Sequence, residues 1–160
     1  MIGKSDWLER RSRLAPGRVA VIDGDTGQRW TYGDLRERAN RLARFLHSHG
    51  VGKGDRVTLL APNHLAYLDM LWACARLGAI FVPLNWRLAA TELAEVVNDC
   101  TPSLLFVHAR FADRAAKLAV PHTMVIEDAA YLEVLSYGRL KRLDGAAPRG
   151  WWHRGADGRV

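Results

Sequence analysis

Apolar residues along this chain follow two different spacings. Short runs that contain almost only apolar or β-branched residues, such as 57–61 and 79–84, are separated by longer stretches in which apolar residues recur every three or four positions. The first pattern is typical of strands buried on both faces, and the second of helices with one buried face. The stretch from Thr31 to Gly50 shows the helical spacing at Leu35, Ala39, Leu42 and Leu46.

Strand and helix patterns alternate through most of the chain. The predicted strands cover 18–22, 28–32, 57–61, 79–84, 103–108 and 122–126. The predicted helices run from Trp7 to a point before Pro16, and over 31–50, 64–77, 91–100 and 111–119. Because parallel strands need helical crossovers, this alternation predicts an α/β fold with a mainly parallel sheet of about five strands, flanked by helices on both faces. The turn-rich residues 23–27 predict that the first two strands form a hairpin.

Length and charge indicate where the folded part lies. The chain has 160 residues, a length that suits one domain. Residues 139–160 carry a net charge of +4, whereas residues 1–138 carry only +2. We therefore expect one α/β domain over 1–138 and a basic, disordered tail over 139–160. A domain with nearly balanced charge does not present the basic face that nucleic-acid recognition requires, so no nucleic-acid partner is expected.

The tail has neither a helical nor a strand period. Residues 144–160 are rich in Gly, Ala, Arg, Pro and Trp, whose codons are rich in G and C. This composition is typical of a GC-rich gene read out of frame up to a chance stop codon. A natural linker or a deliberate truncation would give an equally irregular end, so all three origins stay open. In each case Trp151 and Trp152 are expected to remain unpacked.

The apolar stretches and the cysteines bear on the cellular compartment. The longest apolar stretch, Leu65–Leu77, is interrupted by two charged residues and is too short to cross a bilayer. Residues 1–6 lack the apolar segment of a secretory signal. Cys74 and Cys100 lie in apolar helical patterns and are expected to be buried free thiols, which favours a reducing, cytoplasmic location. A disulfide between them is the alternative.

The glycine-rich stretch Gly50–Gly54 is the candidate phosphate loop. Such a loop follows a strand and opens a helix, so that backbone N–H groups at the helix start meet the phosphate. Here the glycines follow the predicted helix 31–50 and precede the strand 57–61. This reversed polarity favours a helix end and a tight turn over a nucleotide site.

Histidine, serine and cysteine offer no convergent catalytic set. His47 and His49 are two residues apart on a helix, so we expect surface histidines rather than metal ligands. His108 and His122 flank the helix 111–119, and either could approach a ligand at a strand end or simply pack in a loop. The serines lack a Gly-x-Ser-x-Gly elbow, and buried thiols make poor nucleophiles. The serines are Ser5, Ser12, Ser48, Ser103 and Ser136.

Three tryptophans and one arginine complete the candidates. Trp30, Trp72 and Trp86 fall within predicted elements or at their edges, so we expect them to pack in the core. Arg87 follows the carboxyl end of the strand 79–84, where open α/β sheets bind ligands. It either lines such a crevice or donates hydrogen bonds to loop carbonyls.

Three blocks of sequence carry a family resemblance. They are Leu77–Leu93, Trp30–Leu35 with Arg38–Ala43, and Gly50-Val51 with Gly54–Val57 and Pro62-Asn63. Over roughly Trp7 to Gly138, the chain resembles the acyl-adenylate-forming (AMP-dependent synthetase/ligase) superfamily, most closely the N-terminal part of a fatty-acyl-CoA synthetase. The resemblance implies that these blocks are scaffold of the first α/β subdomain of that fold.

The resemblance also implies a chemistry for the full-length family. A carboxylic acid and ATP yield an acyl-adenylate and pyrophosphate, and coenzyme A then takes the acyl group, with Mg²⁺ assisting. The superfamily's phosphate loop ending in Pro-Lys-Gly, its aromatic-Thr-Glu segment for Mg²⁺, its ribose-binding Asp and its C-terminal Lys have no counterpart here. We therefore carry over no catalytic, cofactor-binding or metal-binding residue.

The resulting prediction is an N-terminal fragment of an ATP-dependent acyl-CoA synthetase that is inactive alone and binds none of these cofactors. The alternative is a stand-alone α/β module that binds a partner or a small ligand without catalysis. In either case we expect the apolar surface around Leu65–Leu77 and Ala79–Leu84 to be exposed and to favour self-association.

Overall fold

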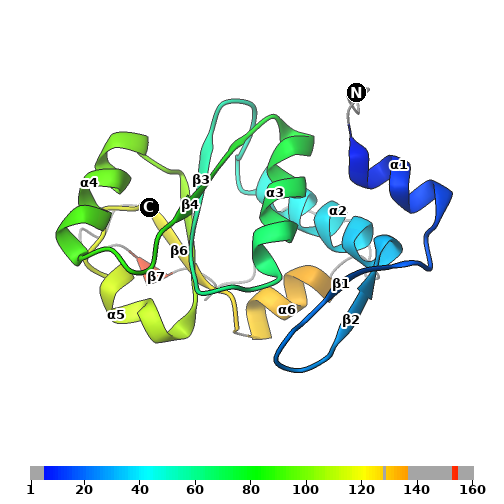
Figure 1. Cartoon of the computed structure of the whole chain (residues 1–160). Coiled ribbons are helices and arrows are strands. Elements are labelled where there is room, and N and C mark those ends of the chain that lie inside the picture. Colours follow the sequence, from blue (N-terminus) through cyan, green and yellow to red (C-terminus); the bar gives the residue numbers. More distant parts are fainter. Residues whose placement is uncertain (1–5, 128, 137–152, 155–160) are drawn as a thin grey trace.

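A computed structural model describes residues 6–127, 129–136 and 153–154 (Figure 1). The strands of its main sheet are β3 (Arg56–Leu60), β4 (Ile80–Leu84), β5 (Leu104–Val107), β6 (His122–Val125) and β7 (His153–Arg154). They lie in the order β4-β3-β5-β6-β7. Strands β4, β3, β5 and β6 are parallel, and β7 pairs antiparallel with β6. The predicted α/β fold with a mainly parallel sheet is confirmed.

Helices cover both faces of this sheet, as predicted (Figure 1). One face packs against α2 (Tyr32–Ser48), α3 (Ala66–Leu77) and α6 (Ala129–Ser136). The other packs against α4 (Ala90–Cys100), the 3₁₀ turn η1 (Ala109–Phe111) and α5 (Ala112–Ala115). None of the helices within the described ranges is long and apolar enough to cross a membrane.

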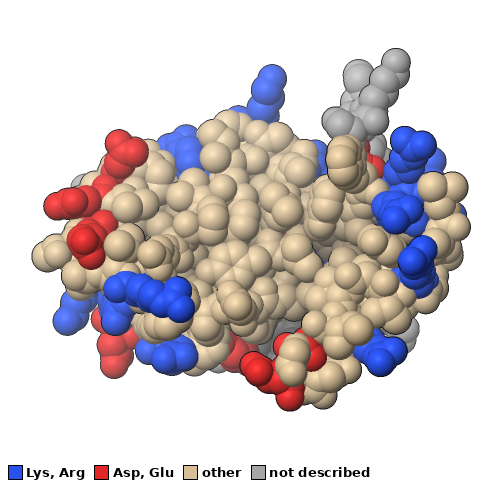
Figure 2. All heavy atoms as spheres, in the orientation of Figure 1, with Lys and Arg blue, Asp and Glu red and all other residues tan. Residues whose placement is uncertain are grey.

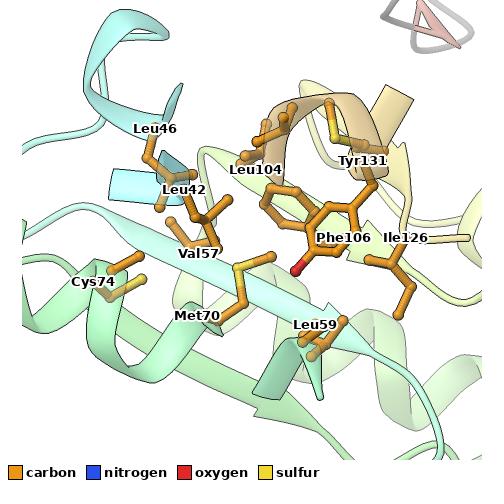
Figure 3. Packing of buried hydrophobic residues seen from close by; sticks show 14 of the residues in the cluster. Leu42, Leu46, Val57, Leu59, Met70, Cys74, Leu104, Phe106, Ile126 and Tyr131 are labelled. Atoms are coloured by element: carbon orange, nitrogen blue, oxygen red, sulfur yellow. The ribbon is translucent and has the colours of Figure 1, made fainter. Parts of the chain in front are cut away.

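The larger core lies between the sheet and α2, α3 and α6 (Figure 3). Val57 and Leu59 point into it, whereas Leu60 faces the opposite core, because side chains alternate across a strand. Phe106 meets the ring of Tyr131 edge-on, with ring centroids 6.0 Å apart. Each fully buried large side chain of this kind stabilises the fold by about 1.5–3 kcal/mol.

The N-terminal region is a separate small layer. Helix α1 (Trp7–Leu14) packs against α2, and the antiparallel hairpin of β1 (Val19–Ile22) and β2 (Arg29–Thr31) lies next to them. The predicted hairpin is thus confirmed.

A capping box starts helix α2. The Thr31 hydroxyl oxygen accepts a hydrogen bond from the Asp34 amide (3.1 Å), and the Asp34 carboxylate accepts one from the Thr31 amide (2.8 Å). Two of the donors that every helix start leaves unpaired are therefore satisfied.

Helices α5 and α6 differ from the sequence prediction, and strand β7 was not predicted. The predicted helix 111–119 is only η1 followed by the single turn α5, because the apolar spacing there continues into the irregular residues 116–121. Helix α6 was not predicted, since its eight residues are too few to show a clear helical period. Of the tail 139–160, only β7 is described; Trp151 and Trp152 lie outside the described residues.

Candidate functional site

The carboxyl edge of the parallel sheet brings several chemically active side chains together. His64 follows β3, Trp86 and Arg87 follow β4, His108 follows β5 and Glu127 follows β6. In open α/β sheets, ligands bind outside this edge. It is therefore the candidate site of the described part of the chain.

Trp86 forms the centre of an aromatic ledge, which we define as Trp86, Phe111, Arg87 and Arg110. The indole stacks on the Phe111 ring, with centroids 5.9 Å apart and an interplanar angle of 22°. The Arg87 guanidinium carbon lies 4.4 Å from the indole centroid, and that of Arg110 lies 5.7 Å from it. Both arginines are exposed. The aromatic ledge thus offers two positive charges beside a flat ring, a combination suited to an anionic or aromatic ligand.

The loop that follows β4 and carries Trp86, which we call the loop below the ledge, is held by a different arginine. Arg114 donates hydrogen bonds through one terminal nitrogen to the carbonyl oxygens of Trp86 (2.9 Å) and Leu88 (3.2 Å). Sequence reasoning had offered Arg87 for this role as one of two alternatives. The geometry gives the carbonyl-binding role to Arg114 and leaves the Arg87 guanidinium stacked on the indole.

His108 and Glu127 form an ion-pair geometry next to the ledge. The His108 Nε2 lies 2.7 Å from a Glu127 carboxylate oxygen, and the other oxygen accepts a hydrogen bond from the Ala109 amide (2.8 Å). The His108 Nδ1 accepts from the Arg110 amide (3.2 Å). Since Nδ1 accepts, the proton sits on Nε2 and is donated to Glu127. Both ring nitrogens are in use, so this pair positions the loop and is not a free general base.

His64 repeats the same capping arrangement at the start of α3. Its Nδ1 accepts a hydrogen bond from the Ala66 amide (3.0 Å), and its ring meets that of His108 edge-on, with centroids 6.4 Å apart. Burial lowers the pKa of His64 below its usual value of 6.5. The histidine is therefore held neutral, which keeps Nδ1 available as the helix cap.

The other candidate histidines lie elsewhere. His122 opens β6 and so stands at the amino end of the sheet, away from the candidate edge. His47 is exposed at the end of α2, and His49 packs its ring against Phe45 with centroids 4.1 Å apart. Within the described ranges, no three His, Cys, Asp or Glu side chains come together in a way that could hold a metal ion.

The backbone N–H groups of the glycine-rich turn already donate hydrogen bonds within the protein. Gly50 and Gly54 have positive φ angles of 81° and 86°, which glycine adopts without strain. The amide of Val51 bonds the Leu46 carbonyl, that of Gly52 bonds the Asp55 carboxylate and that of Gly54 bonds the Gly78 carbonyl. These N–H groups are not available to a phosphate, and the interpretation as a helix end and turn is confirmed.

The candidate nucleophiles are held in structural positions. Both cysteines are free thiols, but only Cys74 is buried; the expectation of a buried Cys100 is wrong, since it is half-buried at the end of α4. Burial raises the pKa of Cys74 to about 12 and raises that of Cys100 as well. Ser12 is buried and donates to the Glu9 carbonyl, and Ser48 donates to that of Phe45. The Ser48 hydroxyl lies 3.2 Å from the His49 Nδ1, but that nitrogen also lies 2.8 Å from the Phe45 carbonyl oxygen, to which it must donate, so it is not a base that could activate Ser48.

Trp30 and Trp72 pack in the N-terminal layer, as expected. They contact the small cluster built on Leu8, Leu35 and Ala39, and both remain half-buried. Trp30 also lines a surface cavity of about 190 Å³ together with Asp34, Glu37, Arg38, Arg41 and Leu135. Trp86 is also half-buried and packs against the core cluster on the other face of the sheet, and it carries the aromatic ledge as well.

A buried polar cluster was not identified from the sequence. Asp69 is only 1% exposed and accepts hydrogen bonds from Arg38 Nε (2.9 Å), from an Arg38 terminal nitrogen (2.7 Å) and from the Tyr131 hydroxyl (2.9 Å). Burial and the Asp69 charge raise the pKa of Tyr131 well above 10.0. We call Arg38, Asp69 and Tyr131 the buried junction, because it connects α2, α3 and α6. Its only sequence signal is an aspartate inside the apolar stretch 65–77.

Comparison with known proteins gives one consistent family. A family model described as AMP-binding enzyme matches residues 8–148. A feruloyl-CoA synthase from an Amycolatopsis species is 44% identical over 117 residues, and an indoleacetate–CoA ligase from Aromatoleum aromaticum is 38% identical over 149 residues. These matches cover 73% and 91% of this chain but 23% and 29% of the relatives. The chain thus spans about a quarter of the length of the curated relatives it matches.

Solved structures share the fold. A Mycobacterium tuberculosis fatty acyl CoA synthetase aligns with a TM-score of 0.74 and 31% identity, covering 81% of this chain and 27% of its own. The O-succinylbenzoate coenzyme A synthetase of Bacillus subtilis, solved in complex with ATP and magnesium ion, aligns with a TM-score of 0.69 and 28% identity, covering 81% of this chain and 33% of its own.

Proposed function

Because the chain belongs to the AMP-binding enzyme family, we propose that it represents the N-terminal α/β part of an ATP-dependent acyl-CoA synthetase. The complete enzyme would convert a carboxylic acid and ATP into an acyl-adenylate and then into an acyl-CoA. The observation that carries this proposal is the match of residues 8–148 to the family, joined with relatives whose names are CoA synthases and ligases.

In this proposal the chain supplies one wall near the substrate cleft. The aromatic ledge lies at the carboxyl edge of the sheet, where a ligand held by the rest of an enzyme would approach. The His64 and His108 caps fix the loops on either side of it. These groups orient and bind, and none of them has a free base or nucleophile with which to perform a reaction.

ATP and Mg²⁺ are cofactors of the family, and a B. subtilis structural relative is solved with both. The described residues of this chain do not fit the triphosphate. The amides of the glycine-rich turn are used within the turn, and the turn precedes a strand. We therefore infer that the chain alone neither binds ATP nor forms an acyl-adenylate, and that no catalytic, cofactor-binding or metal-binding residue lies in it.

Calorimetry with Mg-ATP and pyrophosphate exchange with aromatic and long-chain acids test this proposal. We expect ATP affinity no tighter than about millimolar and no exchange with any acid. Measurable exchange that disappears on substitution of a residue within 1–138 would overturn the assignment of this part as scaffold.

The competing function is a non-catalytic module that associates with itself or with a partner. One observation supports this alternative: the middle of the face shown in Figure 2, over β4 and α3, carries almost no charged side chains. Leu71 and Ile80 in these elements are 45% and 50% exposed. We propose weak self-association through this face, because its apolar side chains are exposed and few charges surround them.

Strand addition at β4 is not the expected mode of self-association. The Ile80 amide donates a hydrogen bond to the Asp55 carbonyl on the β3 side. Because backbone N–H and C=O groups alternate in direction along a strand, those at positions 81 and 83 point to the open edge, away from β3. Proline has no N–H, and a proline at this position blunts a sheet edge against pairing. Contact through side chains of the uncharged face is therefore proposed.

The sequence of the gene discriminates the two functions. Downstream of Leu143, the other reading frames would encode a Ser/Thr/Gly-rich loop ending in Pro-Lys-Gly if the synthetase proposal is correct. An intact stop with no ligase sequence downstream favours the module. A cytoplasmic location is proposed as well, because Cys74 and Cys100 are both free thiols.

A further inference from the structure

Helix α1 presents large apolar side chains to solvent. Trp7 is 75% exposed and Leu14 is 70% exposed. Their separation of seven residues places both on one side of the helix, opposite the buried Leu8 and Ser12. The outer side of a surface helix normally carries polar residues, so two bulky apolar side chains there indicate a binding surface.

Two arginines occupy the same side of α1. Arg10 and Arg11 are three and four residues after Trp7, and both are exposed. The Arg11 guanidinium carbon lies 5.6 Å from the centroid of the Tyr32 ring of α2, so Arg11 lies at the border of this side. The acidic residues of this region face elsewhere: Asp6 pairs with Arg76 Nε (3.1 Å) and Glu9 with Arg13 Nε (2.8 Å). The outer side of the helix therefore combines apolar groups with positive charge. We define Trp7, Arg10, Arg11 and Leu14 as the α1 face.

The chain that follows α1 continues this character. Arg18 is exposed, and Val19 and Ile22 of β1 are 39% and 55% exposed. Figure 2 shows Lys and Arg side chains gathered at the end of the molecule where Figure 1 places α1, in contrast to the uncharged middle of the same view. Exposed apolar residues with positive charge between them thus belong to one end of the molecule.

We propose that the α1 face docks this chain on the surface of an anionic lipid bilayer. The Trp7 indole suits the headgroup region, the Leu14 side chain can enter the acyl boundary, and Arg10 and Arg11 can pair with lipid phosphate and carboxylate groups. A nucleic acid would leave Leu14 without a partner, and a bilayer uses all four side chains. Since α1 has only eight residues, docking is weak and reversible.

Vesicle flotation with the full chain tests the proposal. We expect binding to vesicles of phosphatidylcholine mixed with phosphatidylserine, weak binding to phosphatidylcholine alone, and release by salt. Replacing Arg10→Gln and Arg11→Gln together should weaken binding about 25-fold, since each arginine near a charged bilayer contributes a factor of about five. The pair Trp7→Ser and Leu14→Ser should weaken it at least about fivefold.

The control is Val96→Ser, which removes an exposed apolar side chain from α4, on the opposite face of the sheet from α2 and α1, and should leave binding unchanged. Trp7 emission should shift to shorter wavelength on anionic vesicles, and the shift should vanish in Trp7→Phe. Circular dichroism checks that the variants fold.

Three results would overturn the proposal. The first is equal binding to neutral and anionic vesicles. The second is binding that persists in both α1 variants, which would assign it to the basic residues 139–160 instead. The third is binding of a DNA duplex or a protein in place of vesicles.

Discussion

The buried junction and the aromatic ledge both bring arginine and aromatic side chains together, but the arginines of the ledge are exposed to water. In the buried junction, Asp69 accepts two hydrogen bonds from Arg38 and one from Tyr131. At the aromatic ledge, the exposed Arg87 and Arg110 lie over a half-buried indole, and Glu127 pairs with His108 at the side. The groups are chemically alike, but the solvent around them differs.

That difference decides what each cluster does. A charge taken out of water must keep its partner, so removing one member of the buried junction leaves a costly unpaired group. A charge that stays in water loses little when its neighbour is removed, and it remains able to bind a ligand. The buried junction therefore holds α2, α3 and α6 together, while the aromatic ledge leaves its charges available.

The strongest test of this comparison is Asp69→Ala. We expect it to reduce the free energy of unfolding by about 3 kcal/mol, because the Arg38 guanidinium and the Tyr131 hydroxyl lose their shared acceptor. Urea denaturation followed by circular dichroism measures the loss. Tyr131→Phe is the milder control, expected to cost about 1 kcal/mol since the Arg38–Asp69 pair persists. Equal losses for the two variants would contradict the shared-acceptor account.

The second test asks whether the loop below the ledge is held by Arg114 or by the stacking of Trp86 on Phe111. Arg114→Ala removes the hydrogen bonds to the Trp86 and Leu88 carbonyls and should cost about 1.5 kcal/mol. The same denaturation experiment measures it, and the emission of Trp86 should change with it as the loop loosens. A loss below about 0.5 kcal/mol would show that the loop is held by the Trp86–Phe111 stacking instead.

The sequence predicted the scaffold of this molecule much better than its polar contacts. Spacing sufficed for β3 to β6 and for α2 to α4, because burial on a sheet or helix face imposes a period on apolar residues. The capping box of α2 was also predicted, since Thr31 and Asp34 are only three residues apart. Both kinds of signal are local.

The clusters depend on residues far apart in the sequence. Asp69 meets Tyr131 across 62 positions, and Arg114 meets the Trp86 carbonyl across 28. No periodicity indicates such pairs, and α6 itself was missed because its eight residues are too few to show a helical period. His108 was a candidate, but its pairing with Glu127 depends on the neighbouring order of β5 and β6. Polar clusters of this kind follow from topology rather than from local sequence.

A third test measures how the stability of the fold depends on pH through His64, which lies just before α3. Burial lowers the pKa of His64 below 6.5, so the unfolded chain binds a proton there more readily than the folded one. Stability should be greatest above pH 6.5 and fall as the pH drops below that value towards the folded pKa. Glu127 and Asp69 oppose this lowering, whereas His108 and Arg38 add to it.

Thermal melts across this range measure the effect, and His64→Asn provides the matched variant. Asparagine can accept the Ala66 amide as a cap but does not titrate, so the fall in stability on acidification should be smaller. His47→Asn, at an exposed position on α2, should leave the pH dependence unchanged. The account fails if the two variants behave alike.

The smallest effect is expected for Arg87→Ala, and this makes it the most specific test of the comparison. Arg87 is exposed and its guanidinium lies over the Trp86 ring, an arrangement that contributes about 0.5 kcal/mol at exposed sites. The denaturation midpoint should therefore barely move, in contrast to Arg114→Ala, which removes hydrogen bonds to the same loop. A polyanion such as heparin, titrated while Trp86 fluorescence is recorded, should instead bind several-fold more weakly, because the aromatic ledge loses one of its two charges. If Arg87→Ala destabilises the fold as much as Arg114→Ala does, the ledge is part of the scaffold and is not an available binding surface.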